Sequence, residues 1–151
     1  MPDPHSVFAA YANLLVSYCL DIQEGDRLLI NTSTLAEPLL QALYPLCLEK
    51  GAIVECDIQF KHQSKLFYSH ASDHVMNTPP PFYEYATTTF NKFLTISAPF
   101  DPNALSGVSP DRLAQRQKTM GPLKKTMLER GSQNDVTWTI CMMPTQALSD
   151  I

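Results

Sequence analysis

The chain has 151 residues, of which 44% are hydrophobic and 17% charged, and its formal net charge at pH 7 is −4. This is enough for one domain with a buried core, and the negative charge gives no general attraction to nucleic acid or anionic membranes. No apolar stretch approaches the ~20 residues that a membrane span needs, and no signal peptide is visible. We therefore expect a soluble, cytoplasmic protein.

Hydrophobic patterning predicts strands and helices in turn along the chain. Apolar residues at three- and four-residue steps indicate helices, and short apolar runs rich in β-branched residues indicate strands. The expected helices cover residues 6–22, 35–50, 62–76, 82–90 and 110–130, and the expected strands cover 28–30, 53–58, 93–98 and 136–143. Because strands joined by helices form right-handed parallel units, we expect a three-layer, Rossmann-like α/β fold. Its mainly parallel sheet has about four strands, with helices on both faces.

Capping residues predict where several helices begin and end. Ser6 is expected to cap the first helix, and Ser109, followed by Pro110, caps the last one. Gly121-Pro122 should bend that last helix, and Gly131 should end it.

The clearest candidate site is the strand-to-helix junction near residue 31. Thr34 and Glu37 have the spacing of a capping box, in which each side chain satisfies a free backbone amide. Ligands of α/β sheets gather at such junctions, where free amides hold a carboxylate or phosphate. Asn31, Thr32, Thr34 and Glu37 are therefore candidates for substrate access or anion binding, and plain capping is the alternative.

Three histidines are possible metal ligands. His70 and His74 are four residues apart and share a helix face, with His62 and Asp73 nearby. However, the glutamate that follows the first histidine of an HExxH motif is missing. We therefore favour polar surface or half-buried histidines over a weak metal site.

Other chemical motifs are weak. The four cysteines, Cys19, Cys47, Cys56 and Cys141, form no CxxC pair and are expected to be reduced and buried in the core. No GxGxxG, GxxxxGK[ST] or GxSxG pattern is present, which disfavours dinucleotides, P-loop nucleotides and a hydrolase nucleophile elbow.

Charged and aromatic residues on the later elements have plain explanations. Glu55 and Asp57 share one face of a strand, as an acid/base pair or, more simply, as a solvent-facing edge. Trp138 is expected in the core. The last helix carries six of the eleven basic residues but few aromatics, so a solvated face or a patch against a partner domain is favoured over nucleic acid.

Five segments of the chain resemble one family. They are residues 18–26, 31–39, 98–100, 138–139 and 144–147, and they resemble the N-terminal domain of the leucine aminopeptidase T / aminopeptidase S family of thermophilic metalloproteases. The resemblance implies a homodimeric aminopeptidase that removes N-terminal residues from peptides with two divalent metal ions. The implied metal ligands belong to a C-terminal catalytic domain beyond this sequence, so none is assigned here.

Residues 145–151 look like the start of another helix, too short to be stable alone. We therefore expect an N-terminal α/β domain over residues 1–144, and a truncated helix over 145–151 that leads to the absent catalytic domain. The expected role is scaffold, peptide access and dimer contacts, with no catalytic residue, metal ligand or cofactor in this chain. The alternative is a stand-alone Rossmann-like module for binding a small anion or for dimerisation.

Overall fold

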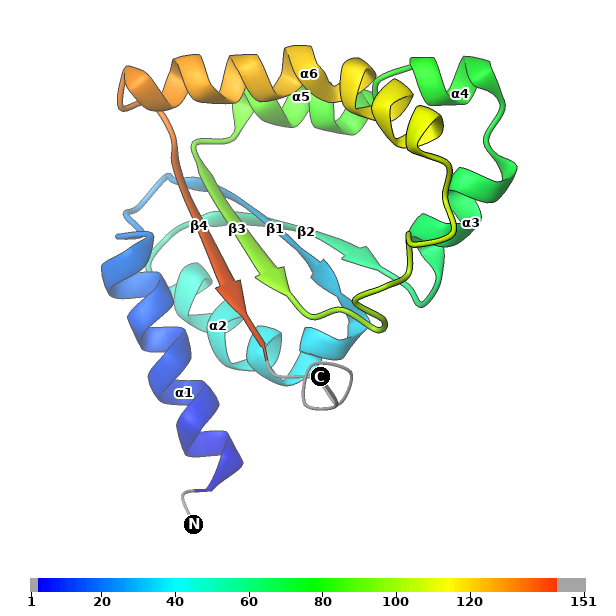
Figure 1. The fold of residues 1–151 in the computed structure, drawn as a ribbon. Coiled ribbons are helices and arrows are strands. Elements are labelled where there is room, and N and C mark those ends of the chain that lie inside the picture. The colour runs from blue at the N-terminus through cyan, green and yellow to red at the C-terminus, as the bar shows by residue number, and fades with distance from the viewer. Residues whose placement is uncertain (1–2, 144–151) are drawn as a thin grey trace.

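A four-stranded parallel sheet lies between two layers of helices in the computed structural model, which describes residues 3–143 (Figure 1). The strands are β1 (Arg27–Ser33), β2 (Ile53–Gln59), β3 (Lys92–Ser97) and β4 (Thr137–Met142). Their order across the sheet is β2-β1-β3-β4, and each neighbouring pair is parallel. The expected three-layer α/β fold is confirmed.

Two helices cover one face of the sheet and the remaining four lie on the other side (Figure 1). The first layer contains α1 (Pro4–Leu14), which continues as a π-helical segment (Leu15–Cys19), and α2 (Glu37–Glu49). The second layer contains α3 (Gln63–His70), α4 (Asp73–Asn77), α5 (Pro81–Thr89) and α6 (Pro110–Ser132). None of the helices in the described residues is long and apolar enough to cross a membrane.

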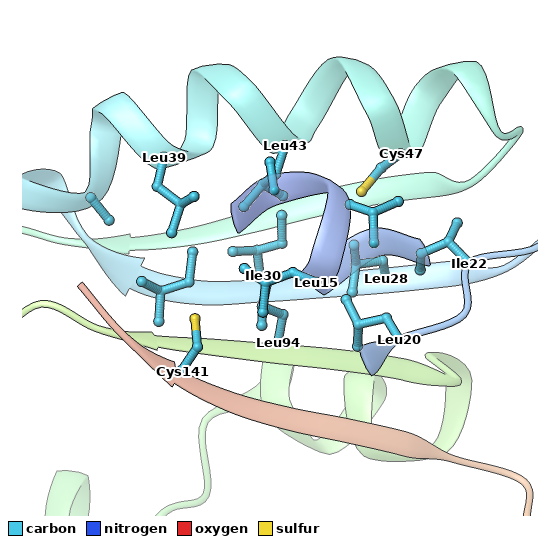
Figure 2. Packing of buried hydrophobic residues seen from close by; sticks show 14 of the residues in the cluster. Leu15, Leu20, Ile22, Leu28, Ile30, Leu39, Leu43, Cys47, Leu94 and Cys141 are labelled. Atoms are coloured by element: carbon cyan, nitrogen blue, oxygen red, sulfur yellow. The ribbon is translucent and has the colours of Figure 1, made fainter. Parts of the chain in front are cut away.

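The main core lies between the sheet and the α1–α2 layer (Figure 2). Ile30 and Leu94, on adjacent strands, face Leu15 and Leu43, and all four side chains are fully or almost fully buried. A smaller cluster on the opposite face of the sheet joins Leu29 to residues of α5. The central strand β1 is therefore covered on both faces, as parallel strands usually are.

The starts of the first two helices differ from the predicted ones. Asp3, not Ser6, caps α1, because its carboxylate accepts a hydrogen bond from the amide of His5. The predicted capping box of Thr34 and Glu37 is also wrong. A 3-10 turn (Thr34–Ala36) precedes α2, and the hydroxyl of Ser33 accepts from the amide of Leu35 instead.

The predicted helix over residues 62–76 is two helices. Ala71 is extended, and Ser72 starts α4 by accepting a hydrogen bond from the amide of Val75. The cap of α6 is confirmed, because the Ser109 hydroxyl accepts from the amide of Arg112. Gly131 does not end α6, which runs on to Ser132. The predicted helix over 145–151 lies outside the described residues.

Arginines of α6 fasten the other three helices of its layer. Arg112 donates to the carbonyls of Tyr68 and Ala71 at the end of α3, at 3.0 and 2.7 Å. Arg116 donates to three carbonyls at the end of α4, and Arg130 to two at the end of α5. Each arginine thus satisfies carbonyls that a helix end leaves without partners. The arginine side of α6 is therefore not the solvated face that its charge pattern predicted.

Candidate functional site

A pocket of about 390 Å³ opens at the carboxyl ends of β1, β2 and β3. The chain leaves β1 for β2 on one side and later returns to β3 on the other, so the pocket lies where the strand order reverses. Ligands of open α/β sheets bind at this type of switch point. The lining residues are Asn31, Thr32, Ser33, Gln59, Phe60, His62, Gln63, Ser64, Lys65, Thr95, Ile96, Ser97, Ala98, Pro99, Phe100, Asp101 and Ala104.

Two hydroxyls in the pocket wall are already used to hold the strands together. The Thr32 hydroxyl donates to the carbonyl of Ile96 at 2.8 Å, and the Ser33 hydroxyl donates to the carbonyl of Ala98 at 2.6 Å. Both bonds lie beyond the last β1–β3 residue pair in the ladder, Asn31 with Thr95. Thr32 and Ser33 are buried, so their role is to fix the pocket floor.

Asn31 is held by a chain of hydrogen bonds that starts on β2. The Tyr83 hydroxyl, on α5, donates to a carboxylate oxygen of Asp57 at 2.7 Å and accepts from the side-chain amide of Asn31. Burial, and then the hydrogen bond to the Asp57 carboxylate and its charge, raise the pKa of Tyr83 well above its usual value. The tyrosine hydroxyl therefore stays protonated, and it donates this proton in its hydrogen bond to Asp57.

The hydrogen bond from Tyr83 to Asp57 determines how the Asn31 amide is oriented. Because the only proton of the Tyr83 hydroxyl goes to Asp57, the hydroxyl can only accept from Asn31, and Asn31 must present its NH₂ group. Its carbonyl oxygen, Oδ1, makes no hydrogen bond to any other described residue, and Asn31 lines the pocket. The site therefore holds a fixed hydrogen-bond acceptor on its central strand.

The structure separates the four site residues predicted from the sequence. Asn31 and Thr32 line the pocket, whereas Thr34 is exposed and does not. Glu37 lies in a different hollow between α1 and α2, which also contains His5 and Phe8, and its carboxylate accepts from Gln41 at 3.1 Å. Two of the four predicted residues, Asn31 and Thr32, thus line the pocket, and the other two lie outside it.

Sequence reasoning missed the pocket residues that come from the other strands. Thr95 and Ser97 lie on β3 and Asp101 follows it. Lys65 follows β2, as does His62, which the sequence indicated only as a possible metal ligand. Their common signal is a position at or after the carboxyl end of a predicted parallel strand. With the strand order known, that position alone would predict these residues as part of the pocket.

The other sequence candidates are dispersed. Across residues 3–143, no three His, Cys, Asp or Glu side chains lie together in a way that could hold a metal ion. His62 lines the pocket and His70 and His74 do not. Glu55 is exposed, while Asp57, on the same face of β2, is engaged by Tyr83, so the two carboxylates have separate environments.

Two expectations about buried side chains need correction. Cys47 and Cys141 are buried, but Cys19 is only half-buried and Cys56 is exposed, because β2 is an edge strand. Burial raises the pKa of the Cys47 thiol to about 11, which makes it a poor nucleophile. Trp138 is 46% exposed and rests against Gly131 of α6, so it is not a core residue.

A comparison with models of protein families matches residues 5–151 to the thermophilic metalloprotease family M29. The chain belongs to the M29 family. Among solved structures, wild-type AmpT from Thermus thermophilus is 20% identical with a TM-score of 0.74, over 91% of this chain and 36% of that chain. This M29 chain thus spans little more than a third of AmpT, and the likeness shows a shared fold.

A second solved structure is more distant from this M29 chain. CurA in complex with NADPH, from Vibrio vulnificus, is 12% identical with a TM-score of 0.33, over 88% of this chain and 53% of that chain. No curated protein matches the chain.

Proposed function

We propose that this chain acts as the N-terminal, non-catalytic domain of a metal-dependent aminopeptidase that removes N-terminal residues from peptides. The match to AmpT supports this proposal, because it covers 91% of this chain but only 36% of AmpT. A chain that corresponds to one part of a longer metalloprotease is expected to supply scaffold and substrate access. Cytoplasmic location and homodimer contacts belong to the same proposal.

The residues described here do not suit a two-metal centre. The pocket contains one histidine, His62, and one carboxylate, Asp101, whereas its remaining polar groups are hydroxyls, amides and the ammonium of Lys65. Divalent metals in peptidases need several His, Asp or Glu ligands around one ion. In our proposal the two metal ions and the cleavage of the peptide bond therefore belong to a C-terminal catalytic domain, and this domain shapes the approach to it.

The test is hydrolysis of leucine amide by the purified 151-residue chain with added zinc, cobalt or manganese. We expect no release of leucine above the rate of the metal alone, while a full-length member of the M29 family is active in the same assay. Robust, metal-dependent release of leucine by the chain alone would refute the proposal.

A further inference from the structure

The polar groups of the pocket divide into those already bonded within the fold and those left free for a ligand. Thr32 and Ser33 belong to the first kind. The side chains of His62, Lys65 and Thr95 make no hydrogen bond or ion pair with any other described residue. Pockets that bind small molecules combine apolar walls with a few convergent polar groups of this kind. Phe60, Ile96, Ala98 and Phe100 supply such walls here.

The free charges are arranged by sign across the pocket. Lys65 follows β2 on one side, and the Asp101 carboxylate follows β3 on the other, with Asn31 on β1 between them. One Asp101 oxygen accepts from the amide of Asn103 at 2.8 Å, which holds the carboxylate in place. The pocket therefore has a basic side toward β2 and an acidic side toward β3. Between them lies a neutral hydrogen-bond acceptor, the side-chain carbonyl of Asn31.

We infer that this pocket binds a short zwitterionic peptide, with its carboxylate toward Lys65, its ammonium toward Asp101 and a backbone N–H donating to Asn31 Oδ1. The ends of β2 and β3 stand two strand spacings apart, roughly 10 Å. An extended peptide rises about 3.3–3.6 Å per residue, so about three residues span that gap. The proposed function enters only in the choice of a peptide as the ligand.

Asp57 and Tyr83 are positioning residues in this arrangement. They fix the Asn31 amide so that its oxygen is the group offered to the ligand. Without the Tyr83 hydroxyl the amide can turn over and present NH₂ instead, which suits a peptide N–H less well.

The experiment is a titration of the 151-residue chain, by calorimetry and by amide chemical shifts, with trialanine and two blocked forms of it. N-acetyl-trialanine lacks the ammonium, and trialanine amide lacks the carboxylate. We expect saturable binding of trialanine with shifts at Asn31 and Thr95, and about tenfold weaker binding of each blocked peptide, since each loses a charged hydrogen bond.

Variants assign each end of the peptide. Lys65→Met is expected to weaken the binding of trialanine about tenfold and to leave the binding of trialanine amide unchanged. Asp101→Asn is expected to weaken the binding of trialanine about tenfold and to leave the binding of N-acetyl-trialanine unchanged. Lys118→Met and Asp135→Asn, two exposed residues outside the pocket lining, are the matched controls and should bind like the parent chain. All of these positions are exposed, so folding is retained.

No saturable binding of trialanine, or binding of the blocked peptides as tight as that of trialanine, would overturn the inference. Tyr83→Phe adds a further readout, because it should weaken trialanine while leaving the ratio between the two blocked peptides unchanged; a change in that ratio would contradict the positioning role. Hydrolysis of leucine amide is measured separately, so binding and the proposed function can each fail alone.

Discussion

Tyr83 connects two strands of the sheet through one hydroxyl group. The hydroxyl bonds to Asp57 on β2 and Asn31 on β1, and the ring packs beside the small cluster around Leu29. Its effect on the molecule therefore has a polar part, which sets the pocket, and an apolar part, which a phenylalanine would keep. These two parts can be separated by substitution.

Tyr83→Phe is expected to lower the free energy of unfolding by about 1–3 kcal/mol, because two half-buried polar groups lose their partner while the ring packing remains. Urea unfolding measures this change. Tyr85→Phe is the matched control on the same helix, since Tyr85 is 59% exposed and should change stability by less than about 0.5 kcal/mol. Equal effects of the two substitutions would show that the hydroxyl bonds contribute nothing.

The raised pKa of Tyr11 predicts how the free energy of unfolding changes at alkaline pH. Burial, and then the neighbouring Cys141 thiol, raise the pKa of Tyr11 from 10.0 to about 12, and its hydroxyl donates to the carbonyl of Met142. Above pH 10 the unfolded chain loses this proton while the folded chain keeps it, so stability falls as the pH rises toward 12. Urea midpoints at about pH 9 and about pH 11 should show a smaller fall in Tyr11→Phe than in the parent; an identical fall would contradict the assignment.

At the scale of elements, α6 holds the other three helices of its layer through three arginines, Arg112, Arg116 and Arg130, which we call the arginine clamp. Arg112, Arg116 and Arg130 reach the carboxyl ends of α3, α4 and α5, whereas Lys118 and Lys124 stay exposed. Arginine suits this use because its planar fork donates in several directions at once. The shared face follows from helical spacing, since Arg112 and Arg116 are four residues apart.

Arg116→Met should destabilise the chain by about 1–2 kcal/mol, because the Thr78 carbonyl loses its donor and the cation leaves the ring of Phe67, now 4.8 Å from its centroid. The Val75 and Met76 carbonyls each lose one hydrogen bond but keep another, from the Thr78 amide and the Thr119 hydroxyl. Lys118→Met, on the same helix, should have no measurable effect. Hydrogen exchange gives a second measurement, in which α4 amides exchange faster only in the arginine variant. Unchanged protection of α4 would rule out the clamp.

The two glycines of α6 make a matched pair. An added methyl group at Gly131 would lie 2.3 Å from the Trp138 ring, whereas one at Gly121 meets nothing within 4 Å. Gly121→Ala should therefore raise stability by about 0.5–1 kcal/mol through helix propensity, and Gly131→Ala should lower it by about 1 kcal/mol or more. Thermal unfolding compares them, and a stabilising Gly131→Ala would show that Trp138 moves aside freely.

At the scale of the whole molecule, the sequence predicts what is local and misses what the strand order brings together. The apolar run at Leu28–Ile30 identified β1, and Ser109 identified the start of α6, because each signal lies within one element. Ser33 rather than Thr34 caps the turn after β1, and the same Ser33 hydroxyl bonds to Ala98, 65 residues away. No local pattern could distinguish the two hydroxyls.

The candidate site follows the same rule. Asn31 and Thr32 were predicted because they end a strand, whereas Lys65 and Asp101 meet them only through the order β2-β1-β3. The arginine clamp was missed for the same reason, since its acceptors are backbone carbonyls, which every residue has. Family membership, by contrast, was predictable from short motifs spread along the chain, and the match over residues 5–151 confirms it.

We propose that the metal ions of the aminopeptidase are bound outside this chain. The most direct test of this proposal is a calorimetric titration of the 151-residue chain with zinc, followed by a crystal structure of the chain grown with zinc. We predict no stoichiometric high-affinity binding and no buried zinc site. Two zinc ions bound per chain by its own side chains, in a cleft open to peptide, would contradict this proposal.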